Sequence, residues 1–268
     1  MTENEGGGAS AVDTSVARQA RIYDYLLGGK DNFAVDREAA DQALAAFPGL
    51  VTWARQNRAF LARAVNYLVA DQGIRQFLDI GTGLPTASNT HEVAQRIAPE
   101  TRVVYVDNDP VVLVHAQSLL VGTPEGATAY IQADLRDPET ILAQARQTLD
   151  FSRPVALMLL AILHVIPDDD DPWDVVGRLM AALPSGSYLV ISHPARDIHP
   201  EQIAEMTNRF NQRLGSVVSH GRTRDEVARF FAGLDLVEPG IVSTPRWRPG
   251  TGLDPAEDPA YAVVARKP

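Results

Sequence analysis

Short apolar runs alternate with stretches of helical periodicity between residues 76 and 192, and this alternation constrains the fold more than any other feature of the chain. The apolar runs are 77–80 (FLDI), 102–106 (RVVYV), 127–132 (ATAYIQ), 155–163 (VALMLLAIL) and 188–192 (YLVIS). The helical stretches between them are 90–98, 110–120, 138–149 and 173–183. Strands that alternate with helices predict an α/β fold with a doubly wound, mostly parallel sheet. The continuous run 155–163 is typical of a strand buried on both faces.

The segments on either side of this region follow other patterns. Apolar spacing predicts three helices ahead of the first strand, at 12–28, 36–47 and 52–72. After the fifth strand, the sequence predicts a helix at 200–214 and a capping box from Thr223 to Glu226. Two late strands, 236–242 and 261–265, predict an antiparallel hairpin at the sheet edge. We therefore expect a flexible tail at 1–10, an N-terminal helical segment at 11–75 and a Rossmann-like domain at 76–268.

Composition excludes several classes of function. The chain has 268 residues and no cysteine, so disulfides, thiolate metal sites and cysteine nucleophiles are ruled out. Its formal net charge is −10, which disfavours binding to a nucleic-acid backbone. The acidic, Gly-rich start is unlike a secretory signal, and no apolar run reaches the ~18 residues of a membrane helix. We expect a cytoplasmic protein with no membrane partner.

A Gly-Thr-Gly turn follows the first predicted strand in QFLDIGTGLP. Glycine permits a tight turn and the close approach of a ligand. The turn is not GxGxxG, and Asp79 ahead of it would oppose a phosphate, so a cationic ligand fits better. Two glycines also occur in ordinary strand-to-helix turns, so the turn alone leaves both readings open.

Two further acids follow the second and third predicted strands. Asp107 ends RVVYVD, and Asp134 with Leu135 follows ATAYIQ. Ligands of doubly wound sheets bind at the carboxyl ends of the strands, where an acid can accept two hydrogen bonds from a ribose diol. An acid at a strand end is commonly only a turn residue. Three such acids on successive strands favour a nucleoside cofactor, with Asp107 at the ribose and the 134–135 pair at the adenine edge.

These motifs resemble those of class I S-adenosylmethionine-dependent methyltransferases. FLDIGTG resembles their first motif, VVYVDND the second and QADLRD the third. ARIYDYLLGGKDNFAVDREAA, THEVA and DNDPVV extend the likeness over nearly the whole chain, to an actinobacterial family of S-adenosyl methyltransferases. Leu84-Pro85 replaces the last glycine of the common E/DxGxGxG pattern, and this turn is typical of the narrower family. The resemblance implies a seven-stranded sheet and S-adenosylmethionine as cofactor, with S-adenosylhomocysteine as product.

The resemblance also implies roles for particular residues. Cofactor contacts are implied for Asp79, Gly81, Thr82, Gly83, Asp107, Asn108, Asp134, Leu135 and Ala161. Within this set, the 81–83 turn would line the methionine part, and Asn108 would lie beside the adenine. A leading helical segment often closes over the cofactor in these enzymes, so Tyr23 and Lys30 become candidate contacts; polar residues at a helix end are otherwise a solvated cap.

Histidines supply the candidate catalytic and substrate contacts. His164 follows the fourth strand and could act as a general base on an oxygen or nitrogen nucleophile. His193 ends the fifth strand on the same side and could contact the substrate. Either histidine could instead be hydrogen-bonded at a strand end with no chemical role. The acidic run 168–171 reads as a solvated loop, so we expect no metal, and Arg246-Trp247-Arg248 reads as an exposed loop or a contact for an anionic substrate.

Three hypotheses remain open at this point. The first is an S-adenosylmethionine-dependent methyltransferase that acts on a small-molecule O or N acceptor. The second is a nicotinamide-dependent oxidoreductase, which the incomplete glycine fingerprint and the absence of YxxxK disfavour. The third is a protein that binds the cofactor without turnover. No N/D-P-P-Y/F run follows the fourth strand, which disfavours amino methylation of DNA bases. Both a monomer and a homodimer are compatible with the sequence.

Overall fold

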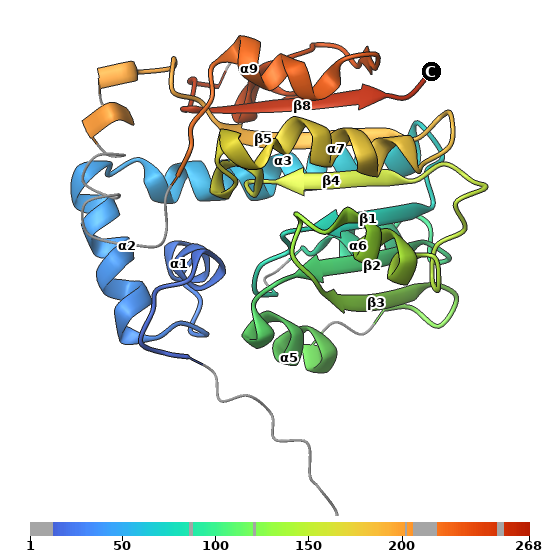
Figure 1. Ribbon diagram of the computed structural model, residues 1–268, viewed down its shortest axis with the longest axis horizontal. Helices are drawn as coiled ribbons and strands as arrows, with labels where there is room; N and C mark the ends of the chain where they lie inside the picture. The colour runs from blue at the N-terminus through green and yellow to red at the C-terminus, as the bar shows by residue number, and fades with distance from the viewer. Residues whose placement is uncertain (1–12, 86–87, 120–121, 202, 206–218, 251–254) are drawn as a thin grey trace, which may run out of the picture.

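The computed structural model describes residues 13–85, 88–119, 122–201, 203–205, 219–250 and 255–268. Its centre is one mixed sheet with helices on both faces (Figure 1). The predicted tail at 1–10 and most of the predicted helix at 200–214 lie outside the described residues.

The sheet has eight strands in the order β3-β2-β1-β4-β5-β8-β6, and β7 also pairs with β8. The first five strands are parallel, and β8 runs antiparallel to β5, β6 and β7. The strands are β1 (Gln76–Ile80), β2 (Arg102–Asp107), β3 (Ala127–Gln132), β4 (Ala156–Leu160), β5 (Tyr188–Pro194), β6 (Asp235–Leu236), β7 (Val242–Ser243) and β8 (Ala260–Arg266). The prediction of a doubly wound, mostly parallel sheet with antiparallel strands at one edge is confirmed.

The strand count differs from the predicted seven because the predicted strand 236–242 is two short strands. Pro239 has no N–H to donate to a ladder, and Gly240 has a φ of +82°, which extended backbone does not adopt. β6 and β7 therefore pair with β8 separately, on either side of this interruption.

Two hydrophobic clusters cover the two faces of the sheet. One face packs against α6 (Pro138–Ala145), α7 (Pro172–Ala181) and α9 (Arg224–Ala228). The other packs against α3 (Leu50–Ala70), α4 (Thr90–Gln95) and α5 (Pro110–Leu119). Adjacent strand residues face opposite clusters, as Phe77 and Leu78 do, which is why the strands read as continuous apolar runs. Short 3₁₀ turns complete the chain: η1 (Leu163–Val165), η2 (Asp168–Asp170), η3 (Arg229–Phe231) and η4 (Thr244–Arg246).

The N-terminal helices α1 (Gln19–Leu26) and α2 (Ala34–Ala46) form a separate small cluster with the start of α3. They lie beyond the carboxyl ends of the parallel strands, at the left of Figure 1. α1 begins seven residues later than the predicted 12–28 helix because Asp13 accepts hydrogen bonds from the backbone and side chain of Ser15, which favours a turn over a helix. The predicted boundary between residues 75 and 76 remains a prediction, since α3 shares a hydrophobic cluster with β1 and β4. No helix within the described ranges is long and apolar enough to cross a membrane.

Candidate cofactor site

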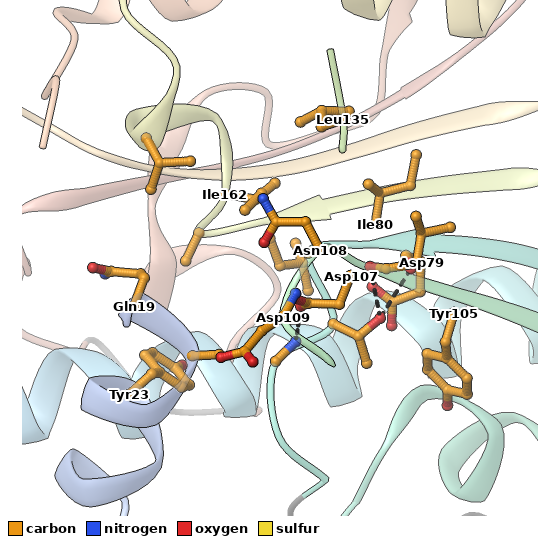
Figure 2. A pocket seen from close by; sticks show the side chains of 18 of the residues that line it. Gln19, Tyr23, Asp79, Ile80, Tyr105, Asp107, Asn108, Asp109, Leu135 and Ile162 are labelled. Atoms are coloured by element: carbon orange, nitrogen blue, oxygen red, sulfur yellow. Dashed lines mark hydrogen bonds between the residues drawn. The ribbon is translucent and has the colours of Figure 1, made fainter. Parts of the chain in front are cut away.

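A cavity of about 410 Å³ lies at the carboxyl ends of β1, β2 and β4, between the sheet and α1. Figure 2 shows side chains from both sides of it: Gln19 and Tyr23 come from α1, and Asp79 and Asp107 come from β1 and β2. Ten of the predicted cofactor residues line this cavity, namely Tyr23, Asp79, Gly81, Thr82, Gly83, Asp107, Asn108, Asp134, Leu135 and Ala161. The strand ends and α1 thus bring together residues that span about half of the chain, from Tyr23 to Ala161.

The Gly-Thr-Gly turn needs glycine at its first position for two reasons. Gly81 has a φ of +76°, in the left-handed region that favours glycine. A Cβ built on Gly81 would lie 2.4 Å from Cγ1 of Ile162, which follows β4 and lines the same cavity. The turn therefore gives close access to its backbone and lets Ile162 pack against it.

Asp79 is a buried acid on the cavity wall. Its side chain accepts a 2.6 Å hydrogen bond from the hydroxyl of Thr90, and the residue is only 5% exposed. Burial raises the pKa of Asp79 to about 6, because the charged form is poorly solvated. A cation in the cavity would stabilise the carboxylate, so this position suits a positively charged ligand group.

Asp107 anchors the loops on both sides of the cavity. One carboxylate oxygen accepts a hydrogen bond from the Gly83 N–H, and the other accepts one from the Asp109 N–H, both at 2.9 Å. Burial raises the pKa of Asp107 above its usual range. Each carboxylate oxygen has a second lone pair, so Asp107 can still accept hydrogen bonds from a diol.

Asp134 is fixed by Arg136, which sequence reasoning missed. The guanidinium donates to both carboxylate oxygens of Asp134, at 2.9 and 2.8 Å, and the same carboxylate accepts a 3.3 Å bond from the Asn108 amide. The hydrogen bonds from Arg136 lower the pKa of Asp134 to about 2. Asp134 is thus permanently charged near neutral pH, and it joins the loops that follow β2 and β3.

The acidic run 168–171 has structural partners. Asp170 pairs with Arg136 at 3.2 Å, Asp168 pairs with the buried Arg222 at 2.7 Å, and Asp171 caps α7. Within the part of the chain that the structure describes, no group of three or more His, Asp or Glu residues could hold a metal ion. The acids serve in ion pairs and a helix cap, which their spacing alone did not reveal.

A buried ion pair attaches α1 to the second strand end. Arg21 donates to both oxygens of Asp109, each at 3.0 Å, and the two side chains are 2% and 4% exposed. Asp109 lies in the same loop as Asp107, so α1 is held against the loop that carries the predicted ribose ligand. No local pattern signals this contact, because 88 positions separate the partners.

A chain of hydrogen bonds connects α1 with the end of β4. The side-chain Nδ2 of Asn57 donates to the Tyr23 hydroxyl at 2.9 Å. The Ser192 hydroxyl donates to the side-chain Oδ1 of Asn57 at 2.5 Å. Ser192 in turn accepts a 3.0 Å bond from the backbone N–H of Ala161. Ala161 has a φ of +51°, uncommon outside glycine, so the surrounding bonds must hold this turn in place.

Three predicted site residues lie outside the cavity. Lys30 is exposed on the turn after α1, beyond the cavity lining. His193 is buried; its Nε2 accepts a 2.8 Å hydrogen bond from Arg222, and its Nδ1 donates to the Pro194 carbonyl. Burial lowers the pKa of His193 well below its usual value. The structure therefore places His193 in a packed polar cluster.

His164 lies directly behind the cavity wall. It is 2% exposed, and its Nε2 is 3.2 Å from the amide nitrogen of Gln19, a residue that lines the cavity. Burial lowers the pKa of His164 to about 4, so the imidazole is neutral and accepts a hydrogen bond from the Gln19 amide. The His164 Nδ1 and the Gln19 Oε1 are buried without a partner in the described chain. His164 can act on the cavity through Gln19.

The Arg246-Trp247-Arg248 segment is not an exposed aromatic contact. Trp247 is fully buried and packs edge-on against Phe60 and Tyr67 of α3. Arg63 holds the segment by donating to the backbone carbonyls of Trp247 and Thr244. Trp247 is therefore part of the core, which the loop-like composition concealed, while Arg246 and Arg248 on either side of it are exposed.

The parallel sheet, the acids at its strand ends and the cavity beneath α1 define a class I methyltransferase fold. The chain belongs to the S-adenosyl methyltransferase family, whose model matches residues 5–268. A DUF574-family protein from Streptomyces avermitilis is 48% identical, with a TM-score of 0.91 over 96% of this chain and 99% of that one. A Thermobifida fusca protein proposed to be a methyltransferase is 45% identical, with a TM-score of 0.86 over 95% and 96%.

More distant structures share the fold alone. Human N-acetylserotonin methyltransferase in complex with S-adenosylmethionine is 15% identical, with a TM-score of 0.50, and the match covers 93% of this chain and 64% of that one. Among curated proteins, none matches this chain. The family membership establishes a methyltransferase that uses S-adenosylmethionine, and the resemblance noted in the sequence is confirmed.

Proposed function

We propose that this protein transfers the methyl group of S-adenosylmethionine to an oxygen or nitrogen atom of a small-molecule acceptor inside the cavity under α1. The observation that carries this proposal is the convergence of Asp79, Asp107 and the 134–135 loop on one cavity. The residues present suit the cofactor, since the buried acid Asp79 faces the cavity and matches a cationic amino group. The bound cofactor supplies a methyl group attached to a sulfonium sulfur, and this sulfur leaves without help from an acid.

Each wall of the cavity has a proposed part in binding. Asp79 would pair with the amino group of the methionine moiety, and the backbone of Gly81 and Gly83 would face its chain. Asp107 would accept hydrogen bonds from the ribose, and Asn108 with the 134–135 backbone would border the adenine. Arg58, on the same wall as Asp79, has the charge to attract the methionine carboxylate.

The remaining wall has a different character and would receive the acceptor. Val16, Ile162, Val165 and Ile166 are apolar, and Gln19 adds an amide. Such a wall suits a mostly apolar molecule, held and oriented so that its nucleophilic atom points at the methyl group while water is excluded. We infer that His164 acts as a positioning residue for Gln19, because its neutral ring lies outside the cavity. Direct contacts from His193 and Lys30 stay predictions.

The acidic composition and the size of the cavity also support an acceptor other than nucleic acid. We retain the expectation of a cytoplasmic location from the sequence. The net charge of −10 repels a phosphate backbone. The acceptor must share the cavity of about 410 Å³ with the bound cofactor, which suits a small molecule.

Calorimetric titration with S-adenosylmethionine, S-adenosylhomocysteine and NADH tests the cofactor, and a panel of phenols, amines and carboxylic acids then tests transfer. We expect the first two ligands to bind, NADH not to bind, and S-adenosylhomocysteine to form above the spontaneous background with at least one acceptor. Tight cofactor binding with no product across the whole panel would favour a binding protein over an enzyme.

A further inference from the structure

A second cavity, which the cofactor site does not use, lies at the opposite end of the sheet. It measures about 310 Å³ and lies where the amino ends of β1 and β5 meet the carboxyl end of β8. These strand ends lie on the right in Figure 1, on the side away from α1. We call it the basic groove and define it by Gln72, Arg75, Arg153, Gly186, Tyr188 and Arg266. About five residues of strand, roughly 15 Å, separate it from the cofactor cavity.

The charge of the basic groove is opposite to that of the whole molecule. Of the residues that the structure describes, three arginines and no Asp or Glu line it, although the chain carries a net charge of −10. Over the described residues, the side chains of Arg153 and Arg266 take part in no hydrogen bond or ion pair. Arg153 and Arg266 are exposed, so water solvates them in the free protein and their guanidinium groups are accessible to a ligand. Like charges gathered in one hollow raise the local positive potential, which favours an anionic ligand.

Among the described residues, no neighbouring acid forms an ion pair with Arg153 or Arg266. Glu100 pairs with Arg75 at 2.7 Å, outside the groove lining. Asp150 accepts hydrogen bonds from the backbone and hydroxyl of Ser152, which lower its pKa, and the nearby charge of Arg153 lowers this pKa further without forming an ion pair. Asp235 stands opposite Arg266 in the β6–β8 register, yet the two form no ion pair. Arg153 and Arg266 are thus available to a ligand.

The walls of the groove are fixed by backbone and side-chain hydrogen bonds. Arg75 donates to the carbonyls of Val69 and Ile74, both at 3.0 Å. The Gln76 amide donates to the Asp150 carbonyl at 2.8 Å and accepts from its N–H, which holds the turn that carries Arg153.

The wall formed by β5 and β8 is also fixed by strand pairing and a hydrogen bond. Arg266 is in register with Tyr188 on β5, whose hydroxyl donates to Gln72 at 2.7 Å. One Arg266 Nη lies 3.9 Å from the Cβ position of Gly186, so the guanidinium is at the groove wall. The backbone positions of both arginines are thus fixed, and only their side chains must be ordered when a ligand binds.

We propose that the basic groove binds a small multivalent anion that carries phosphate or carboxylate groups. A guanidinium donates two parallel hydrogen bonds to either group, so arginines on facing walls match an anion with two such groups. The volume of about 310 Å³ fits a molecule of metabolite size rather than a polymer. The site is separate from methyl transfer and does not depend on the acceptor.

The test is calorimetric titration of the full chain with pyrophosphate, inorganic phosphate and citrate, at constant ionic strength set with chloride. We expect saturable one-to-one binding of at least one of these anions. The double variant Arg153→Gln/Arg266→Gln should weaken the affinity for the anion by about tenfold or more. Each lost guanidinium group removes charge-assisted hydrogen bonds. Tighter binding of the phosphates than of citrate would assign a phosphate ligand, and the reverse order a carboxylate ligand.

A matched control distinguishes binding in the basic groove from a general effect of the net charge of the protein. Arg55 and Arg224 are exposed arginines outside the groove, so Arg55→Gln/Arg224→Gln changes the net charge equally. The control should bind the anion as the unmodified chain does, and all three proteins should bind S-adenosylhomocysteine equally. Absence of saturable binding for every anion, or an equal loss in the control, would overturn the proposal.

Discussion

Asp107 illustrates how one side chain can serve both a loop and a ligand. Its two oxygens hold Gly83 and Asp109 while the carboxylate faces the cavity. We expect Asp107→Ala to weaken S-adenosylmethionine binding by about 1–3 kcal/mol, the scale of hydrogen bonds lost to a charged group. Titration calorimetry measures the loss, with Glu125→Ala as a control because Glu125 is exposed and outside the cavity. Unchanged affinity in a folded Asp107→Ala protein would contradict the placement of the ribose.

Asp79 makes cofactor binding depend on pH. Its pKa is about 6 in the free protein, and an adjacent ammonium group would lower that pKa by stabilising the carboxylate. Cofactor binding then releases a proton below pH 6, so affinity should be full above pH 7 and fall by up to about tenfold per pH unit below 6. Calorimetry from pH 5 to 8 checks this.

The Asp79→Asn variant identifies the source of the pH effect. It removes the titrating group but keeps the shape, so its affinity should be weak and nearly independent of pH over this range. The pKa of Asp107 is also raised, and this acid remains in the variant. A pH dependence that persists in Asp79→Asn would assign the effect to Asp107.

At the scale of elements, α1 is attached to the sheet by few but strong contacts. Arg21→Met leaves Asp109 buried without its ion partner, which costs about 3–5 kcal/mol in buried pairs. We expect α1 to open locally, with faster amide hydrogen exchange over residues 19–26 and weaker cofactor binding, while exchange in β1 and β4 stays slow.

An exposed ion pair provides the comparison for Arg21→Met. Arg178 on α7 pairs with Glu139 on α6, and its side chain is 42% exposed. Arg178→Met should cost less than about 1 kcal/mol and leave α1 exchange unchanged. Equal effects of the two substitutions would show that the buried pair does not hold α1.

The elements predicted best are those whose burial is visible in a local run of residues in the sequence. β1, β2, β4 and β5 are buried on both faces, so β-branched and apolar runs mark them directly, whereas the edge strand β3 is only partly buried. Their carboxyl ends follow from the parallel topology, which is why the strand-end acids were found together. The pairing of Arg21 with Asp109 and the burial of Trp247 depend on distant segments, which neither periodicity nor turn chemistry encodes. The late start of α1 depends on one side-chain turn at Asp13.

At the scale of the whole molecule, the cavity joins α1 to the sheet, so a ligand there should stabilise both. S-adenosylhomocysteine at about 100 times its Kd should add about 2.7 kcal/mol to the free energy of unfolding. For a domain of this size, that corresponds to a rise in Tm of roughly 5–10 °C. Differential scanning calorimetry with and without the ligand measures the shift. NADH at the same concentration should leave Tm unchanged, and an equal shift with NADH would contradict the assigned cofactor.

The contact between Gly81 and Ile162 has a consequence for the evolution of this family. Ile162 packs into the space left by the absent side chain of Gly81, so the wall that would receive the acceptor rests on the turn that would receive the cofactor. Lineages can change residue 162 to accommodate a new acceptor while glycine stays at 81. A side chain at 81 would meet residue 162 and would also be strained at a φ of +76°, so glycine should persist at 81 while diversity in acceptors accumulates on the 162 side.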